Sequence, residues 1–397
     1  MNLSERTRLI TPPGTGKIRV IANSLKESGV HVINFAAGEL DVDTTDTIKQ
    51  AAKAAVDAGR NVYTPALGLN SLRKLVAKRV SRHCGVEYQP SEVGITAGAK
   101  QALYNTAMVL FDPGDEVLIP QPYWVTFPAQ IEMAGGRPVF IDTKPFGYHL
   151  LAAEVERALT PRTKGIVINT PNNPTGAVYA AEELEKIARL ALERNFWIVF
   201  DECYASLVRS GYTHVNIVRL CPAVKERAVL VNSFSKSHAL TGWRVGYVSA
   251  PAAAIKAMEN LQGHTTSNPN SISQYAVQAA LENEDGEFIA RVNRVLDERV
   301  ILVQQIAAQM DGISIAAPEG AFYLFLNVEA KVGRSFRGQI VGDVDQLCEL
   351  ALSHANVAAV SGSAFGEPSA IRVSYAISTE DVVEGFSRLK RFFDEIN

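Results

Sequence analysis

Between Thr45 and Leu281, short apolar runs alternate with amphipathic helical runs, and this alternation restricts the chain to few architectures. The apolar runs carry hydrophobic residues on both faces, as strands buried in a parallel sheet do. Strands and helices that alternate in this way predict an α/β fold, a mostly parallel sheet covered by helices on both faces. We predict strands at 93–96, 116–119, 165–169, 197–200 and 228–232, and helices at 101–110 and 180–194.

The pattern changes after Gly286, where one long helix is predicted, followed by strand-like segments and a closing helix. This order is typical of a smaller α+β domain. The segments are 288–309, 321–328, 370–375 and 379–395. A chain of 397 residues exceeds the roughly 250–300 residues that a single core usually reaches, so two domains are expected. We predict a large domain at 45–285 and a small domain built from both chain ends, 1–44 and 286–397, with a helix at 18–27 in the small domain.

Composition argues against several kinds of partner. The chain has 39 Lys and Arg against 42 Asp and Glu, which gives a net charge of −3, and it has no basic block. Nucleic acid and anionic membranes are therefore not expected as partners. The beginning of the chain is polar and lacks the apolar core of a secretory signal, and no run reaches about 18 apolar residues, so no membrane span is expected.

The cysteines and histidines indicate neither disulfides nor a metal site. The four cysteines are scattered without a C-x-x-C pair, which fits neither a disulfide framework nor a zinc knuckle. We therefore expect a reducing, cytoplasmic location. The seven histidines show no H-x-x-x-H spacing, and none lies beside a second potential ligand in the sequence, so no metal site is expected.

Residues that follow the predicted strands are the candidates for chemistry, because ligands of open α/β sheets gather outside the carboxyl ends of the strands. One strand leads into the turn Gly98-Ala99-Lys100, where a helix begins and its free N–H groups favour an anion such as phosphate. Tight packing is the alternative explanation of this turn. Lys100 opposes the helix dipole, which indicates a nearby negative ligand, and a solvent-facing lysine is the alternative.

Three further strand ends carry polar groups. Residues 170–176 read T-P-N-N-P-T-G, a rigid loop that either aims an asparagine into a cleft or serves only as a turn. Asp201 stands directly at a strand end, where an isolated buried carboxylate is unfavourable and must be paired or functional. Lys236 lies close to another strand end, where burial favours a depressed pKa and nucleophilic amine chemistry.

Four motifs occur together and in order: Asn169-Thr-Pro-Asn-Asn-Pro-Thr-Gly176, Asp201-Glu-Cys-Tyr204, Ser233-Phe-Ser-Lys236 and Gly242-Trp-Arg244. With this spacing the chain resembles the class I aminotransferases of pyridoxal phosphate (PLP) fold type I, and most closely the bacterial aspartate aminotransferase subgroup with its G-[GA]-K-Q turn. The resemblance extends from about Ile18 to Phe392. It implies pyridoxal 5'-phosphate as cofactor, a large domain with a mostly parallel seven-stranded sheet covered by helices, and a smaller α+β domain.

The resemblance implies roles around the cofactor ring. Lys236 would hold the cofactor as a Schiff base and, once substrate displaces it, would move the Cα proton as general base and acid. Asp201 would pair with the pyridine nitrogen and keep it protonated. Asn173 and Tyr204 would hydrogen-bond the ring hydroxyl oxygen, and Trp124 would stack on the ring face. Lys236, Asp201 and Tyr204 are thus the expected catalytic residues.

The resemblance implies that the cofactor phosphate is bound by the turn described above and by side chains near Lys236. These residues are Gly98, Ala99, Lys100, Ser233, Ser235 and Arg244. Tyr63 resembles the tyrosine that reaches the phosphate from the neighbouring subunit. A homodimer with shared active sites follows from that likeness.

For the substrate, the resemblance implies that Arg372 binds the α-carboxylate as a bidentate fork, helped by the backbone at Gly38. A salt bridge within the small domain is the alternative role for Arg372. Lys100 would take the distal carboxylate of a dicarboxylic substrate, and Trp124 and Asn173 would line the same site. The expected reaction moves an amino group between an acidic amino acid, of the aspartate or glutamate type, and a 2-oxo acid by a ping-pong route.

Two positions depart from the family pattern. The family usually reads A-G-E-P-D where this chain has Ala37-Gly38-Glu39-Leu40-Asp41, so a fixed φ is lost in a segment near the substrate. Cys203 replaces a branched aliphatic residue and is expected to act as a small apolar filler. Because lyases and cyclases use nearly the same cofactor set, a specialised PLP-dependent lyase or cyclase acting on a modified amino acid is the alternative function. A non-catalytic PLP-sensing regulator is a third, disfavoured because no helix-turn-helix extension precedes the domain.

Overall fold

The computed structural model describes residues 3–4, 7, 14–283 and 286–397, and its largest sheet has seven strands in the order β2-β8-β7-β6-β5-β3-β4. The strands are β2 (Val93–Thr96), β3 (Glu116–Gln121), β4 (Arg137–Asp142), β5 (Thr163–Asn169), β6 (Trp197–Asp201), β7 (Ala228–Ser233) and β8 (Gly246–Ser249). Every pairing is parallel except those of β8, which runs antiparallel to β2 and β7. The predicted mostly parallel sheet is confirmed, and β4 and β8 are strands that the sequence argument did not identify.

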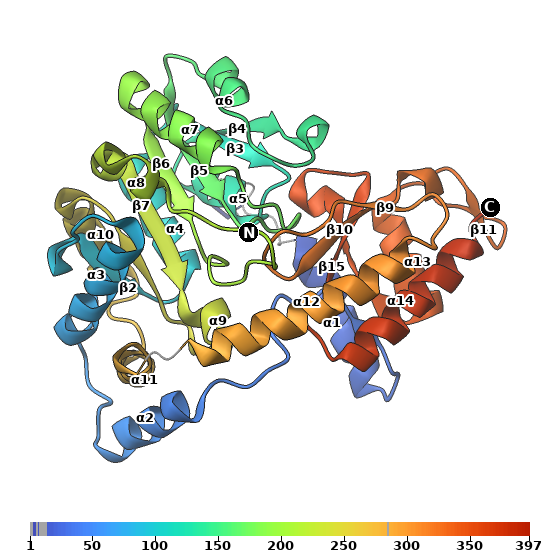
Figure 1. Cartoon of the computed structure of the whole chain (residues 1–397), viewed down its shortest axis with the longest axis horizontal. Coiled ribbons are helices and arrows are strands. Elements are labelled where there is room, and N and C mark those ends of the chain that lie inside the picture. The colour runs from blue at the N-terminus through green and yellow to red at the C-terminus, as the bar shows by residue number, and fades with distance from the viewer. Residues whose placement is uncertain (1–2, 5–6, 8–13, 284–285) are drawn as a thin grey trace.

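Helices cover both faces of this sheet, as Figure 1 shows. Side chains alternate along a strand, so Ile166 and Ile168 of β5 pack into one hydrophobic cluster while Val167 packs into another. The first cluster includes residues of α3 and α7, and the second includes residues of α4 and α10. The helices in this part are α2 (Asp46–Asp57), α3 (Asn70–Cys84), α4 (Ala99–Leu110), α5 (Thr126–Met133), α6 (Ala152–Ala158), α7 (Ala181–Arg194), α8 (Ile217–Leu220), α9 (Phe234–Ser237), α10 (Ala252–Thr265) and α11 (Ser271–Glu282).

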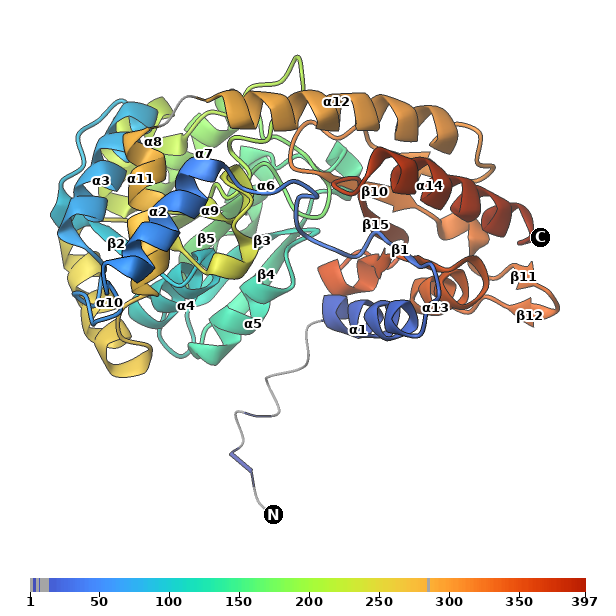
Figure 2. The same cartoon turned by 90° about the horizontal axis from the view of Figure 1, so that it is seen from below.

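A second, antiparallel sheet has the order β14-β15-β10-β9. Its strands are β9 (Ser314–Ile315), β10 (Tyr323–Asn327), β14 (Val360–Ser361) and β15 (Ala370–Ser374), and β11 (Ser335–Phe336) pairs with β12 (Gln339–Ile340) nearby in sequence. The accompanying helices are α12 (Glu287–Ala307), α13 (Val344–Ala355) and α14 (Thr379–Asp394). Figures 1 and 2 both show α12 running from the part around the seven-stranded sheet to the part around β10 and β15.

The two ends of the chain lie together. Strand β1 (Ile33–Asn34) pairs in parallel with β13 (Val357–Ala358), and helix α1 (Gly14–Glu27) contacts β13 and β14. In Figure 2 the blue α1 accordingly lies beside the orange and red C-terminal elements. The predicted domain boundary at 285 falls on residues 284–285, which lie outside the described residues. Among the helices that the structure describes, none has the length and apolar character that crossing a membrane requires.

Candidate active site

A cavity of about 360 Å³ lies at the carboxyl ends of β5, β6 and β7, which contribute Asn169, Asp201 and Ser233 to its wall. This is the edge at which an open α/β sheet binds ligands. Side chains from the second sheet and backbone from the N-terminal segment close the other side. The structure brings the following predicted site residues together in this one cavity: Gly38, Ala99, Lys100, Trp124, Asn173, Asp201, Tyr204, Ser233, Ser235, Lys236, Arg244 and Arg372. Of the predicted residues, Gly98 and Tyr63 do not line it.

Lys236 lies on the short helix α9, which begins directly after β7, so the strand places its amine at the sheet edge. The amine Nζ donates a hydrogen bond to the backbone carbonyl oxygen of Gly38. Burial in the cavity wall lowers the pKa of Lys236 from its usual 10.5 to about 8. A larger fraction of the amine is therefore neutral near neutral pH, as nucleophilic and proton-transfer chemistry requires.

Asp201 ends strand β6 and is only 4% exposed. One carboxylate oxygen, Oδ1, accepts a hydrogen bond of 3.0 Å from the backbone N–H of Cys203. Burial outweighs that bond and raises the pKa of Asp201 to about 6. Within the described part of the chain, no basic side chain forms an ion pair with this carboxylate, so the site is built to receive a positively charged group.

Arg372 points from β15 into the cavity and is 4% exposed. Its Nη1 donates to Oδ1 of Asn173 at 3.0 Å, and its Nη2 donates to the backbone oxygen of Ala36 at 3.1 Å. Nε is buried and has no hydrogen-bond partner in the part of the chain that the structure describes. The guanidinium lies over the rings of Tyr323 and Phe365, 4.4 and 5.0 Å from their centroids. No carboxylate in the described segments pairs with Arg372, so the salt bridge considered as its alternative role is not observed, and a buried cation is left for an anionic ligand.

In the turn before α4, the backbone lies close to the guanidinium of Arg244. Gly98 caps α4 with φ at 78°, and a Cβ at this position would lie 2.7 Å from Nη2 of Arg244. Arg244 is held there by hydrogen bonds from Nη1 to the oxygen of Thr241 (2.9 Å) and from Nη2 to the oxygen of Ala97 (3.3 Å). A helix N-terminus with an arginine beside it is a suitable cradle for phosphate.

Lys100 and Trp124 lie next to each other in the cavity wall. Nζ of Lys100 is 4.8 Å from the centroid of the Trp124 ring, which is within cation–π distance. Gln130 supports this turn from α5, where its Nε2 donates to the backbone oxygen of Lys100 at 3.0 Å. Lys100 therefore adds a cation to the cavity wall besides Arg372 and Arg244.

Tyr323 is a cavity residue that the sequence argument missed. Its hydroxyl lies 3.0 Å from the hydroxyl of Tyr204, and its ring lies beneath the guanidinium of Arg372. The residue begins β10 of the second sheet, so only the packing of that sheet against the first brings it here. Its sequence signal was the predicted strand at 321–328, which gave no reason to single it out.

A separate group of three side chains was also not predicted from the sequence. His83 and His214 both contact the carboxylate of Glu202, with Nε2–Oε1 distances of 2.9 and 2.7 Å. The residues lie on three separate segments of the chain, so no local sequence pattern marks them as neighbours. This group lies outside the cavity described above.

Residues 30–389 match the family model for aminotransferases of class I and II. The chain belongs to this family. The aspartate aminotransferase of Geobacillus stearothermophilus is 40% identical over 395 residues, covering 99% of each chain, and a probable aspartate/prephenate aminotransferase of Aquifex aeolicus is 41% identical over 396 residues, again 99% of each. Among solved structures, the aspartate aminotransferase of Rhizobium meliloti covers 100% of both chains with 35% identity and a TM-score of 0.95. That of Thermus thermophilus with maleate covers 99% of this chain and 100% of its own, with 36% identity and a TM-score of 0.92.

These findings confirm PLP fold type I and an aminotransferase that uses pyridoxal phosphate. The residues of this cavity fit the cofactor chemically. Among the described residues no cation pairs with the buried carboxylate of Asp201. The Gly98 turn beside Arg244 suits a phosphate, and the buried amine of Lys236 suits attachment to an aldehyde.

Proposed function

We propose that this aminotransferase transfers the amino group of an acidic amino acid, aspartate or glutamate, to a 2-oxo acid by a ping-pong route. The observation that carries the proposal is the presence of Arg372 and Lys100, two cations besides the Arg244 assigned to the phosphate, in one cavity that also holds Lys236. Two cations suit a substrate with two carboxylates. Relatives named aspartate aminotransferase support it, as does the Thermus structure that contains maleate, a dicarboxylate. These names favour transamination over the lyase or cyclase alternative.

The cofactor, when bound, supplies an electron-accepting ring next to the Cα of the substrate. Asp201 would hold a proton on the pyridine nitrogen, because its buried carboxylate is stabilised by a cationic partner. Lys236 would attach the cofactor and then take and return the Cα proton, for which a pKa near 8 is well placed. Asn173 and Tyr204 would hydrogen-bond the ring hydroxyl oxygen, and Trp124 would cover the ring face.

Arg372 would bind the α-carboxylate through its guanidinium, and Lys100 would bind the distal carboxylate. Binding the substrate at two points fixes its orientation relative to the catalytic groups, and such positioning contributes much of an enzyme's rate enhancement. Asn173 and the ring of Tyr323 hold Arg372 in place before substrate arrives. The phosphate would lie against the Gly98–Ala99 turn with Ser233, Ser235 and Arg244 around it.

We also infer a homodimer, a cytoplasmic location and a division into two domains. A homodimer with shared active sites is supported by the exposure of Tyr63 and Val62, which are 88% and 70% exposed. Residues that insert into a neighbouring subunit are exposed when one chain is considered alone. A reducing, cytoplasmic location is supported by the four cysteines, all free and buried. A large domain at 45–285 and a small domain at 1–44 and 286–397 are supported by the pairing of β1 with β13.

A substitution at Lys100 tests the substrate assignment. The Lys100→Ala variant should lose roughly 10- to 100-fold in kcat/KM for aspartate, since a hydrogen bond to a charged group contributes about 1.5–3 kcal/mol. Alanine, which lacks a distal carboxylate, should react with Lys100→Ala and the parent at similar rates. Lys256→Ala is the control, because Lys256 is an exposed lysine that pairs with Glu259 on α10. Equal losses for aspartate and alanine in the Lys100 variant would contradict the proposal.

A further inference from the structure

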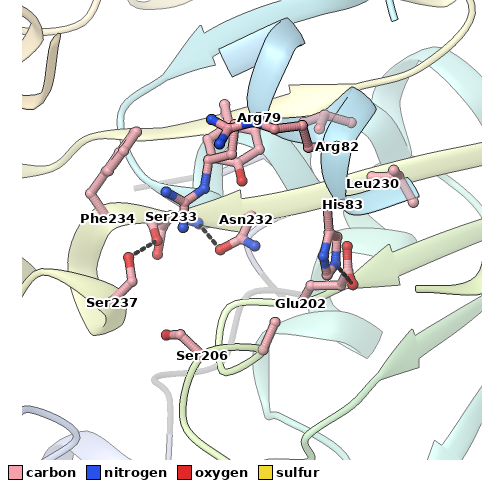
Figure 3. A pocket seen from close by; sticks show the side chains of 13 residues that line it. Arg79, Arg82, His83, Glu202, Ser206, Leu230, Asn232, Ser233, Phe234 and Ser237 are labelled. Carbon is pink, nitrogen blue, oxygen red and sulfur yellow. Dashed lines mark hydrogen bonds and ion pairs between the residues drawn. The ribbon is translucent and has the colours of Figure 1, made fainter. Parts of the chain in front are cut away.

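A second cavity, also of about 360 Å³, lies next to the active site and shares Ser233 with it. Figure 3 shows His83 and Glu202 together at one end of this cavity. The head groups of Arg79 and Arg82 extend toward Ser233, away from that pair. Glu202 directly follows Asp201 in the chain, yet the mechanism above gives none of the cavity's histidine or glutamate residues a role.

Three potential metal ligands meet at the His83 end. Nε2 of His83 and Nε2 of His214 both approach Oε1 of Glu202, at 2.9 and 2.7 Å, and all three ligand atoms lie within 4.8 Å of one another. His83 comes from the last turn of α3, Glu202 follows β6, and His214 precedes α8. Two imidazole nitrogens and one carboxylate oxygen form a donor set that proteins use for zinc.

Surrounding residues fix two of the three ligands. Nδ2 of Asn216 donates to Oε2 of Glu202 at 2.7 Å, which leaves Oε1 to the two histidines. The His214 ring is stacked with Phe200 at a centroid distance of 6.0 Å. The side chains of Glu202 and His214 are each 3% exposed, whereas that of His83 is 41% exposed. The group is therefore anchored by buried members and open to solvent through His83.

We propose that His83, Glu202 and His214 bind one divalent transition-metal ion of the zinc class, with a water molecule in the cavity as the fourth ligand. The ion would take the Nε2 lone pair of each histidine, and any Nε2 proton would leave to Nδ1 or to solvent. Tetrahedral ligands at about 2.0–2.1 Å from zinc lie roughly 3.4 Å apart, so Nε2 of His83 and Nε2 of His214 must each lie roughly 0.5–0.7 Å farther from Oε1 of Glu202 than they do now. The exposed His83 can move toward solvent, whereas the separation from the buried His214 would require a small movement of that ring or of the Glu202 carboxylate.

The test uses the holoenzyme, freed of metal by a chelator and titrated with Co²⁺, whose visible spectrum reports tetrahedral coordination. One Co²⁺ per chain with a tetrahedral spectrum, displaced by Zn²⁺, is expected. Zinc should also raise the melting temperature, because a ligand that binds only the folded chain stabilises it. Absence of stoichiometric binding in the parent protein would overturn the proposal.

Variants locate the site. Loss of an outer-shell partner typically weakens metal binding 10- to 100-fold, so loss of a ligand in His83→Ala or Glu202→Gln should weaken it by roughly 100-fold or more. His149→Ala is the matched control, because His149 pairs with the single carboxylate of Glu319, at 3.2 Å. If Glu202→Gln does not fold, the exposed His83 position still provides the test. Binding of equal strength in His83→Ala, His149→Ala and the parent would place the metal elsewhere and overturn the assignment.

Discussion

Replacing Arg372 by lysine keeps a positive charge in the cavity and removes the geometry on which substrate binding depends. The guanidinium now has two anchors, Asn173 and the oxygen of Ala36, and a buried Nε without a partner. Its plane lies over the rings of Tyr323 and Phe365. A lysine ammonium is a point charge that cannot form a bidentate fork with a carboxylate.

The expected loss follows from these contacts. One charge-assisted hydrogen bond of the fork contributes about 1.5–3 kcal/mol, and loss of the contact with the Tyr323 ring adds roughly 0.5–1 kcal/mol. A total of about 2–4 kcal/mol corresponds to a loss of roughly 30- to 1,000-fold in kcat/KM. The cofactor should remain bound, because Arg372 is assigned to the substrate and not to the phosphate.

The assay is a single-turnover reaction of the holoenzyme with two amines, followed through cofactor absorbance. Aspartate carries both carboxylates, whereas β-alanine keeps the distal carboxylate and the amine but lacks the α-carboxylate. Arg372→Lys should slow aspartate strongly and leave the slow reaction of β-alanine nearly unchanged. A similar fold-loss for both amines, or a loss for aspartate below about threefold, would refute the α-carboxylate assignment.

Three further results are expected. Lys236→Ala should lose covalent attachment of the cofactor and nearly all turnover, seen by absorbance and steady-state rates, and full turnover in this variant would exclude Lys236 as the proton carrier. Gly98→Ala should weaken PLP retention on dialysis by roughly 5- to 100-fold, because alanine would be strained at a φ of 78° and its Cβ would lie 2.7 Å from Arg244. Gly211→Ala is the control, because Gly211 has a similar φ of 91° but open space around it, and this variant should retain PLP normally. The rate at which apoprotein attaches PLP should rise with pH and level off above about 8, because only the neutral amine of Lys236 reacts and its pKa lies near 8; a rate that keeps rising toward pH 10 would contradict the depressed pKa.

Apolar patterning predicted the central strands because they are buried on both faces. Strand β4 was missed because it lies at the sheet edge, contains Pro138 and has only one fully buried residue, so it lacks the continuous apolar run of a buried strand. Strand β8 was missed because it runs antiparallel to both of its neighbours, so the alternation of strand and helix that predicts parallel strands does not include it. The boundaries of α4, α7 and α12 differ from the prediction by a few residues, as helix ends commonly do.

The site residues on strand ends were predictable because a parallel sheet brings its carboxyl ends to one edge. Asp201, Ser233 and Lys236 meet there for this reason. Tyr323 could not be predicted in the same way, because it reaches the cavity only through the packing of the second sheet. The contact of His83 with Glu202 spans 119 residues of sequence, and nothing local marks it.

A single half-reaction distinguishes PLP-dependent transfer of amino groups from acidic substrates from the alternative reactions. Purified holoenzyme is mixed with aspartate in the absence of any 2-oxo acid, and the cofactor spectrum and products are followed. We expect bound PLP to be converted to pyridoxamine phosphate with release of the corresponding 2-oxo acid, and to return to PLP when 2-oxoglutarate is added. Continued consumption of aspartate with no pyridoxamine phosphate formed, or no reaction with either acidic amino acid, would contradict it.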